Sequence, residues 1–287
     1  VCVGGDPAQT AILDNFCWPS CGKPENMGSL VRAAEGCYDG AKAYRTPFVS
    51  GKDSLNNQLR YTDPASGREV VIEIPPTLLI TGLSLVRGLT RVTTMDAKMP
   101  GNLLVLVGTT QPHMAGSLYA DMAGGEGSVE IPTVDLKLGP ATARAVAQCI
   151  ADGLVATAHD CSEGGMLVAV AEMLIATTGQ GAGTGDSPLA QLLSSGRPLS
   201  ALGAELAVSD DLLELHQMAF AESPSRYVME VRPDDLAKVR TVLRDFGGVR
   251  LTVLGKVTGD GRLRWSAASL DAAVNDLADA WRRPLDW

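Results

Sequence analysis

The chain has 287 residues and a formal net charge of −9, and 45% of its residues are hydrophobic. The acidic balance argues against non-specific binding to nucleic acid or to anionic membranes, because both depend on an excess of lysine and arginine. No apolar run approaches the roughly 18 residues that a membrane span needs, and no basic-then-apolar leader opens the chain. The length predicts about two domains, and we expect a cytoplasmic protein. Because the first residue is valine, we expect a piece of a longer protein.

The first third predicts a strand, a long helix and further strands. Residues 11–16 form the first expected strand, which contains Asp14 and Asn15 near its end. Residues 24–44 predict a helix with one buried face, because apolar positions recur at three- and four-residue steps. Those positions are Leu30, Val31, Ala34, Cys37, Tyr38, Ala41 and Tyr44. Residues 48–49 predict a short buried strand and residues 78–82 a strongly apolar one. This order predicts an α/β sheet with a site on its rim.

The most informative stretch is residues 50–57, in which a glycine is followed by polar side chains of several kinds. Gly51 permits close backbone approach to a bulky anion. Lys52 supplies positive charge, Asp53 offers oxygen ligands to a hard divalent cation, and Ser54 adds a hydroxyl donor. These groups suit a nucleotide site in which catalysis is positioning and electrostatics. The alternative is a polar turn with a solvated lysine–aspartate pair.

A domain boundary is expected near residues 93–101, and a second α/β domain with a mixed sheet beyond it. The predicted strands are 102–108, 155–159, 204–208, 227–231 and 251–257, and the predicted helices are 139–154, 164–177, 211–218, 233–246 and one from about 269. A glycine-rich loop surrounds residues 123–128, and residues 178–200 predict a mobile loop. Gly259-Asp260-Gly261 predicts a hairpin turn.

Two loops of the second domain are further candidate sites. Residues 159–165 lie where a strand turns into a buried helix, whose first N–H groups can bind an anion. The alternative is that Asp160 or Ser162 caps that helix and the glycines allow tight packing. Residues 221–226 contain Glu222 and precede a strand, and the alternative there is a turn with a surface salt bridge.

The six cysteines predict neither a disulfide nor a zinc site. Cys17 and Cys21 lie three residues apart, but the three histidines are scattered without the spacing of metal ligands. Reduced thiols are expected in a cytoplasmic protein. The same scattering argues against a Cys–His or Ser–His nucleophilic centre.

Several long motifs follow one another along the chain. They are ILDNFCWPSCGKPENMGSLVRAAEGCYDGAKAYRTPFVSGKDSLNN, IPPTLLITG, PGNLLVLVG, GSLYA, AHDCSEGGMLVAVAEMLIA, FAESPSRYVMEV and WRRPLDW. Together they closely resemble the second half of phosphoribosylformylglycinamidine synthase, a member of the aminoimidazole ribonucleotide synthetase superfamily. The resemblance implies a partial ferredoxin-like α/β domain at residues 1–95 and an α/β domain of the synthetase type at residues 96–287. It also implies ATP-dependent conversion of formylglycinamide ribonucleotide to formylglycinamidine ribonucleotide, with ATP and Mg²⁺ as cofactors.

The resemblance assigns roles to individual residues. Asp14, Gly51 and Lys52 are implied to contact ATP, and Ser54 the substrate. In the shorter bacterial form an asparagine that touches Mg²⁺ stands where this chain has Lys52, so the metal is assigned to Asp53 instead. By pseudo-symmetry with the first half, Asp160 and Glu222 are implied to line an auxiliary nucleotide site. The catalytic histidine of the family belongs to the first half, so no catalytic residue is expected in this chain.

The implied partners are the N-terminal half of the same enzyme and a glutaminase subunit or domain, with a homodimer as another arrangement. Neither nucleic acid nor a membrane is expected as a partner. One alternative function is a non-catalytic nucleotide-binding or dimerisation module of the same superfamily. Another is a different substrate, as in selenophosphate synthetase, thiamine-monophosphate kinase or hydrogenase-maturation proteins. Their glycine-rich, lysine-bearing N-terminal segments are not seen here.

Overall fold

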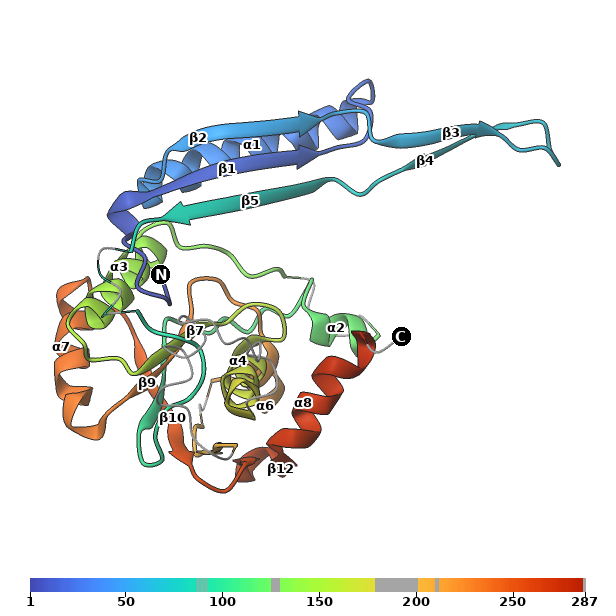
Figure 1. The fold of residues 1–287 in the computed structure, drawn as a ribbon. Coiled ribbons are helices and arrows are strands. Elements are labelled where there is room, and N and C mark those ends of the chain that lie inside the picture. The colour runs from blue at the N-terminus through green and yellow to red at the C-terminus, as the bar shows by residue number, and fades with distance from the viewer. Residues whose placement is uncertain are drawn as a thin grey trace, which may run out of the picture. The chain divides into compact units, whose positions relative to one another are not determined.

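A computed structural model describes residues 1–86, 88, 90, 92–124, 130–178, 201–209 and 212–285. The chain divides into two compact units (Figure 1): the smaller is Gly5–Arg87, and the larger combines Val1–Gly4 with Gly88–Trp287. Each unit has a sheet of its own. Within the described part of the chain, no helix has the length and apolar character that a membrane span requires.

Strand β1 (Thr10–Cys17) is the centre of the smaller unit. It pairs in parallel with β2 (Phe48–Ser54) and antiparallel with β5 (Thr77–Ser84). Helix α1 (Pro24–Tyr44) connects β1 to β2 and runs along the sheet (Figure 1). Pro24 suits the first turn, where its missing N–H is not needed. Strands β3 (Gln58–Thr62) and β4 (Glu69–Glu73) form a separate two-stranded ribbon, and a 3₁₀ turn at Pro7–Gln9 precedes β1.

The prediction of a buried helix face and a buried strand in this unit is wrong. Helix α1 has no fully buried residue, and Val31 and Tyr38 are 49% and 62% exposed. Strand β2 is exposed along most of its length. The periodicity is real, but one helix on a three-stranded sheet offers too little area to enclose the apolar side chains. The smaller unit therefore presents apolar surface of a kind that proteins usually cover with a partner.

The larger unit is built on a seven-stranded mixed sheet in the order β12-β11-β8-β10-β6-β9-β7. Its strands are β6 (Leu103–Val107), β7 (Thr157–Asp160), β8 (Gly203–Leu206), β9 (Tyr227–Val231), β10 (Leu251–Thr258), β11 (Arg262–Trp265) and β12 (Leu270–Ala273). Its helices are α2 (Leu118–Met122), α3 (Leu138–Ala151), α4 (Gly165–Ile175), α6 (Leu215–Phe220), α7 (Leu236–Asp245) and α8 (Val274–Arg282). Short 3₁₀ turns are Ala176–Thr178, Pro233–Asp235, Ser266–Ala268 and Arg283–Leu285.

Two hydrophobic cores lie on opposite faces of this sheet, and β6 contributes to both. Leu104 and Leu106 join the core beneath α4, α6 and α8, whereas Val105 and Val107 join the core beneath α3 and α7. A strand that is buried on both faces reads as a continuous apolar run rather than an alternating one. The predicted mixed α/β architecture is confirmed.

Three local predictions for this unit differ from the structure. Strands β10 and β11 do not form a hairpin across residues 259–261, because β8 lies between them and pairs with both. A helix was predicted from about residue 269, but β12 (Leu270–Ala273) lies there and helix α8 starts only at Val274. Helix α6 starts at Leu215, four residues after the predicted start. The predicted mobile loop falls mainly on residues 179–200, outside the described residues.

A buried carboxylate fixes the segment that leads into β6. Glu230 on β9 has no solvent exposure and accepts hydrogen bonds from Lys98 N (2.7 Å), Met99 N (3.0 Å) and Asn102 Nδ2 (2.6 Å). Burial is the largest influence on this group and raises its pKa. The three donors satisfy an anion that would otherwise be costly to bury.

Replacing Glu230 by alanine leaves three donors without their acceptor, and one of them, Asn102 Nδ2, is buried. A buried group that stays unsatisfied costs about 1–3 kcal/mol, so we expect Glu230→Ala to lower the free energy of unfolding by about 2 kcal/mol or more, measured by urea titration. Glu205→Ala is the matched control, because Glu205 is half exposed and pairs with Lys256 at 3.0 Å on the surface. Glu205→Ala should lower the free energy of unfolding by less than about 1 kcal/mol. Equal losses of stability in the two variants would contradict the role of Glu230 in fixing the segment before β6.

Candidate functional site

The parallel pairing of β1 with β2 brings Asp14 directly opposite Gly51. A Cβ atom at position 51 would lie 2.4 Å from Asp14 Oδ1, well inside van der Waals contact. Any larger residue would force the Asp14 carboxylate to move from this position. Two of the residues that the resemblance implies in ATP binding are thus in contact, and the glycine is explained by its neighbour.

The four residues 51–54 do not share one side of the sheet. Side chains alternate along a strand, and register partners lie on the same face. Asp53 is opposite Phe16 and lies on the face of Asp14, whereas Lys52 and Ser54 are opposite Asn15 and Cys17. We call the first the helix face and the second the outer face.

Contacts with α1 identify the helix face. Asp14 helps to raise the pKa of Cys37 on α1, after burial as the larger cause. Trp18, which follows β1, donates from Nε1 to Ser29 Oγ on α1 at 2.9 Å. Its ring lies 5.6 Å from that of Phe16. On the outer face, Lys52 Nζ donates to Ser54 Oγ.

In the larger unit, Asp160 lies in a charged cluster at the end of β7. His159 Nδ1 is 3.4 Å from Asp160 Oδ1, and His159 Nε2 is 3.2 Å from Glu172 Oε2 on α4. Ser162 Oγ donates to Asp160 Oδ2 at 2.5 Å. The hydrogen bonds to Asp160 and Glu172 raise the pKa of His159 to about 9, and the bond from His159 holds the pKa of Asp160 well below its usual range. Asp160 is therefore ionised and already balanced by a cationic imidazole.

Glu222 joins the starts of two helices. Its Oε1 accepts from Gly164 N at 2.8 Å and from Leu118 N at 2.9 Å. The N-cap of α4 is Gly164, at φ 77°, a conformation that favours glycine. The alternative that Asp160 or Ser162 caps this helix is wrong, since the carboxylate that receives the Gly164 N–H comes from residue 222.

A buried arginine shapes the loop that carries Glu222. Arg226 is 1% exposed and donates to the carbonyl oxygens of Ser223 (3.0 Å) and Ala221 and to Thr110 Oγ1 (3.0 Å). Among the described residues no carboxylate lies within ion-pair distance of it. The alternative of a turn with a surface salt bridge is wrong for Arg226, because this cation is buried and donates to neutral acceptors of the loop.

Sequence reasoning missed His159, Glu172 and Arg226 as partners of the candidate residues. His159 directly precedes Asp160, so its role was visible in principle. Glu172 lies on α4, 12 positions after Asp160, and only the packing of α4 on β7 brings the two together. Arg226 follows Glu222 by four residues in a loop without regular periodicity, and its burial had no local signal.

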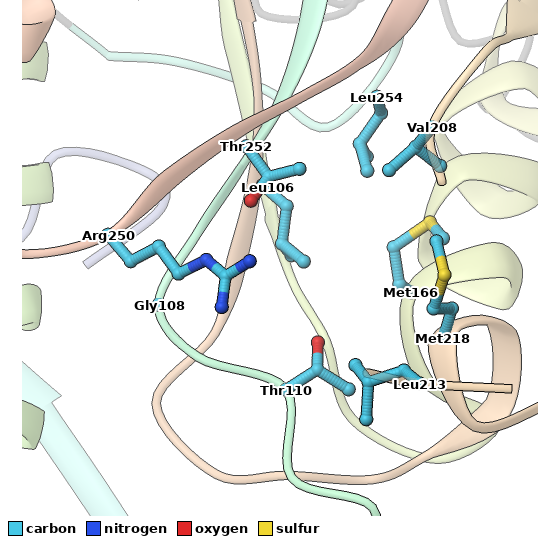
Figure 2. A pocket seen from close by; sticks show the side chains of 10 residues that line it. All are labelled: Leu106, Gly108, Thr110, Met166, Val208, Leu213, Met218, Arg250, Thr252 and Leu254. Atoms are coloured by element: carbon cyan, nitrogen blue, oxygen red, sulfur yellow. The ribbon is translucent and has the colours of Figure 1, made fainter. Parts of the chain in front are cut away.

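Two pockets in the described part of the chain are lined by none of the predicted site residues. The pocket in Figure 2 has Arg250, Thr110 and Thr252 on one side and apolar side chains such as Met166 and Met218 on the other. Those apolar groups belong to the core beneath α4, so this pocket is a gap at the edge of that core. A second cavity of about 100 Å³ lies at the start of α3. The cysteines are free thiols, and no group of three or more metal-ligating side chains occurs in the described ranges.

The His159 cluster predicts a pH dependence of stability. The pKa of His159 rises from 6.5 to about 9 on folding, so its contribution is complete below pH 6.5 and disappears as the pH rises through 9. Because the Asp160 side chain is 55% exposed, solvent screening limits the contribution to about 1–2 kcal/mol. In urea titrations from pH 6 to 10, His159→Gln should lower stability at pH 6 and match the parent at pH 10.

His216→Gln is the control for that series, because His216 pairs with Glu214, whose side chain is 75% exposed. It should follow the parent at every pH. A constant difference between His159→Gln and the parent across the range would show that His159 acts by packing alone.

Known proteins resemble the chain over nearly its whole length. The PurL subunit of phosphoribosylformylglycinamidine synthase from Synechococcus sp. (strain CC9902) is 33% identical over 298 residues, covering 99% of this chain and 35% of the relative. The same subunit from Brucella ovis is 32% identical, covering 97% of this chain and 32% of the relative. The predicted resemblance is confirmed, and the chain spans about a third of the length of these relatives.

Solved structures show the same fold. Thermotoga maritima PurL in complex with FGAR has a TM-score of 0.63 at 18% identity, covering 96% of this chain and 40% of that one. Escherichia coli HypE, a hydrogenase maturation protein, has a TM-score of 0.58 at 14% identity, covering 94% and 74%. The model of the AIR synthase related protein, C-terminal domain, matches residues 99–266. This match spans more than half of the chain, which therefore belongs to the AIR synthase related family.

Proposed function

We propose that this chain is part of an ATP-dependent amidoligase that converts formylglycinamide ribonucleotide to formylglycinamidine ribonucleotide in purine biosynthesis. The observation that carries the proposal is similarity to PurL subunits over 99% of the chain. The contact between Asp14 and Gly51 supports it. Solved PurL structures include complexes with FGAR and with ATP, which supports ATP as the co-substrate.

The helix face fits Mg²⁺. Asp14 and Asp53 place two carboxylates on one face of adjacent strands. Mg²⁺ is commonly held by one or two carboxylates together with substrate phosphates and water. When bound, the ion would neutralise phosphoryl oxygens during amide activation. The chain's own contribution is to orient those carboxylates and, at Gly51, to leave the space that Asp14 occupies.

The proposed chemistry is phosphorylation of the formylglycinamide amide oxygen, followed by displacement of phosphate by ammonia. In this scheme the chain supplies binding and orientation, and the proton-transferring histidine comes from the N-terminal half. A glutaminase subunit or domain supplies the ammonia. We place the assembly in the cytoplasm, in keeping with a purine biosynthetic enzyme.

Asp53→Ala should lower ATP-dependent turnover by about 10²-fold or more, the scale of losing one electrostatic stabiliser. The assay joins the 287-residue chain to the rest of a PurL-type subunit, with ammonia as nitrogen donor. Asp245→Ala is the control, since Asp245 is an exposed residue near Arg244 at the end of α7. Unchanged turnover and unchanged Mg²⁺ dependence in Asp53→Ala would remove Asp53 from the metal site.

The partner of the smaller unit is proposed to be the N-terminal half of the enzyme or, for the chain alone, a second copy. Leu79 and Leu83 on β5 are 59% and 66% exposed, although both belong to a paired strand. Exposed apolar patches of this kind mark protein interfaces, and a two-fold pair is the simplest closed assembly. This exposure also favours the second candidate function, a non-catalytic nucleotide-binding or dimerisation module.

Light scattering at micromolar concentration should therefore give the isolated chain a mass of about twice that of the monomer. Leu79→Ser combined with Leu83→Ser should shift it toward the monomer. Met122→Ser, at a position 88% exposed in the larger unit, should leave the mass unchanged. A monomeric parent chain would rule out the two-fold pair. The turnover assay described above distinguishes the two candidate functions, because a non-catalytic module would not support ATP-dependent turnover.

A further inference from the structure

Four exposed apolar side chains gather on two adjoining short elements of the larger unit. Leu118 and Met122 on α2 are 52% and 88% exposed. Leu215 at the start of α6 is 39% exposed, and Leu212 just before α6 is 89% exposed. Single exposed apolar side chains are ordinary on protein surfaces, whereas a cluster of them marks a binding surface. We call these four side chains the α2–α6 patch.

Ring stacking holds the two helices side by side. The ring of Tyr119 on α2 stacks on those of His216 and Phe220 on α6, with centroid separations of 5.5 and 5.0 Å. The start of α2 is held as well, because Leu118 N donates to Glu222 Oε1 at 2.9 Å. The patch is therefore formed within the chain, and a partner does not have to assemble it.

The side chains of the patch lie outside the hydrophobic core. Residues four apart share a face of a helix, so Leu118 and Met122 are neighbours on α2. Tyr119 is directed to α6 by its two stacking contacts. Helix α6 contributes Met218 and Ala219 to the core beneath α4. The patch is thus a second apolar surface of these helices, left for contact with another molecule.

Negative charge accompanies the patch. Residues 118–122 and 212–220 contain two acidic residues, Asp121 and Glu214, and no lysine or arginine. Asp121 is exposed, and the Glu214 side chain, whose Oε2 lies 3.2 Å from His216 Nδ1, is 75% exposed. A second copy of the chain would bring like charges together here, which opposes association. Charge complementarity instead selects a basic partner.

We infer that the α2–α6 patch binds a basic amphipathic helix of another polypeptide. The apolar side chains of that helix would cover the patch, and its lysine or arginine side chains would meet Asp121 and Glu214. A helix is favoured over an added strand, because the patch offers apolar side chains instead of an unpaired strand edge. Met122 suits such a contact, since methionine adapts its shape to its partner. The inference goes beyond the proposed function and uses none of its ATP-binding or substrate-binding residues.

The test uses the 287-residue chain and a fluorescein-labelled peptide of leucine and lysine, patterned as an amphipathic helix of about four turns. Fluorescence anisotropy should show saturable binding. Leu118→Ser combined with Met122→Ser should weaken binding about tenfold or more, the scale of losing a buried apolar side chain. Leu79→Ser combined with Leu83→Ser is the control. Those leucines are 59% and 66% exposed but lie in the smaller unit, so this variant should bind the peptide as the parent does.

A second peptide, with glutamate in place of lysine, tests the charge. It should bind at least about tenfold more weakly than the lysine peptide, because it brings like charge to Asp121 and Glu214. Asp121→Asn combined with Glu214→Gln should weaken binding of the lysine peptide about threefold or more, the scale of losing two surface ion pairs. Asp245→Asn, at an exposed position on α7, should leave binding unchanged.

Four results would overturn the inference. One is the absence of saturable binding by the parent chain, and another is equal affinity for the lysine and glutamate peptides. A third is an equal loss in the Leu79 and Leu83 control, which would show adsorption to any apolar surface. The fourth is a lower mass of the Leu118 and Met122 variant in light scattering, which would assign the patch to a second copy. Melting temperatures that match the parent show that the variants are folded. None of these results bears on turnover of the assembled enzyme.

Discussion

The parallel pairing of β1 with β2 is the constraint on which the candidate site depends. It sets Asp14 against Gly51 and, through the two-residue period of a strand, assigns each following residue to one face. A shift of the register by one residue would place Lys52 opposite Asp14 and exchange the faces of every side chain. The chemistry of the motif is therefore determined by strand pairing as much as by residue type.

In the larger unit, the candidate residues Asp160 and Glu222 already have hydrogen-bonding partners within the chain. Asp160 is balanced by His159, and Glu222 is occupied by two backbone N–H groups. Both carboxylates already have partners that stabilise the turn between β7 and α4. An auxiliary nucleotide site at these positions would have to share or displace those partners. The helix face of the smaller unit, where Asp14 and Asp53 lie on adjacent strands, remains the stronger proposal for Mg·ATP.

The two units differ in how much apolar surface they leave exposed. The larger unit encloses two cores on the faces of a seven-stranded sheet. The smaller unit has a three-stranded sheet, a two-stranded ribbon and one helix, and many of its apolar side chains, such as Leu79 and Leu83, stay exposed. A unit of that kind is expected to complete its burial with another polypeptide surface, in keeping with relatives that are about three times as long as this chain.

The sequence by itself determined most of the elements and their kind, although it predicted a helix where β12 lies. Apolar periodicity located α1, the continuous run at Leu103–Val107 located a doubly buried strand, and the motifs identified the family. Only the tertiary structure decided which elements meet: β8 separates β10 from β11, Glu172 reaches His159, and Arg226 is enclosed by its own loop. Local patterns report which side chains prefer burial, but strand order and register depend on contacts between residues far apart in the chain. For that reason Lys52 and Asp53, adjacent in sequence, lie on opposite faces of one sheet.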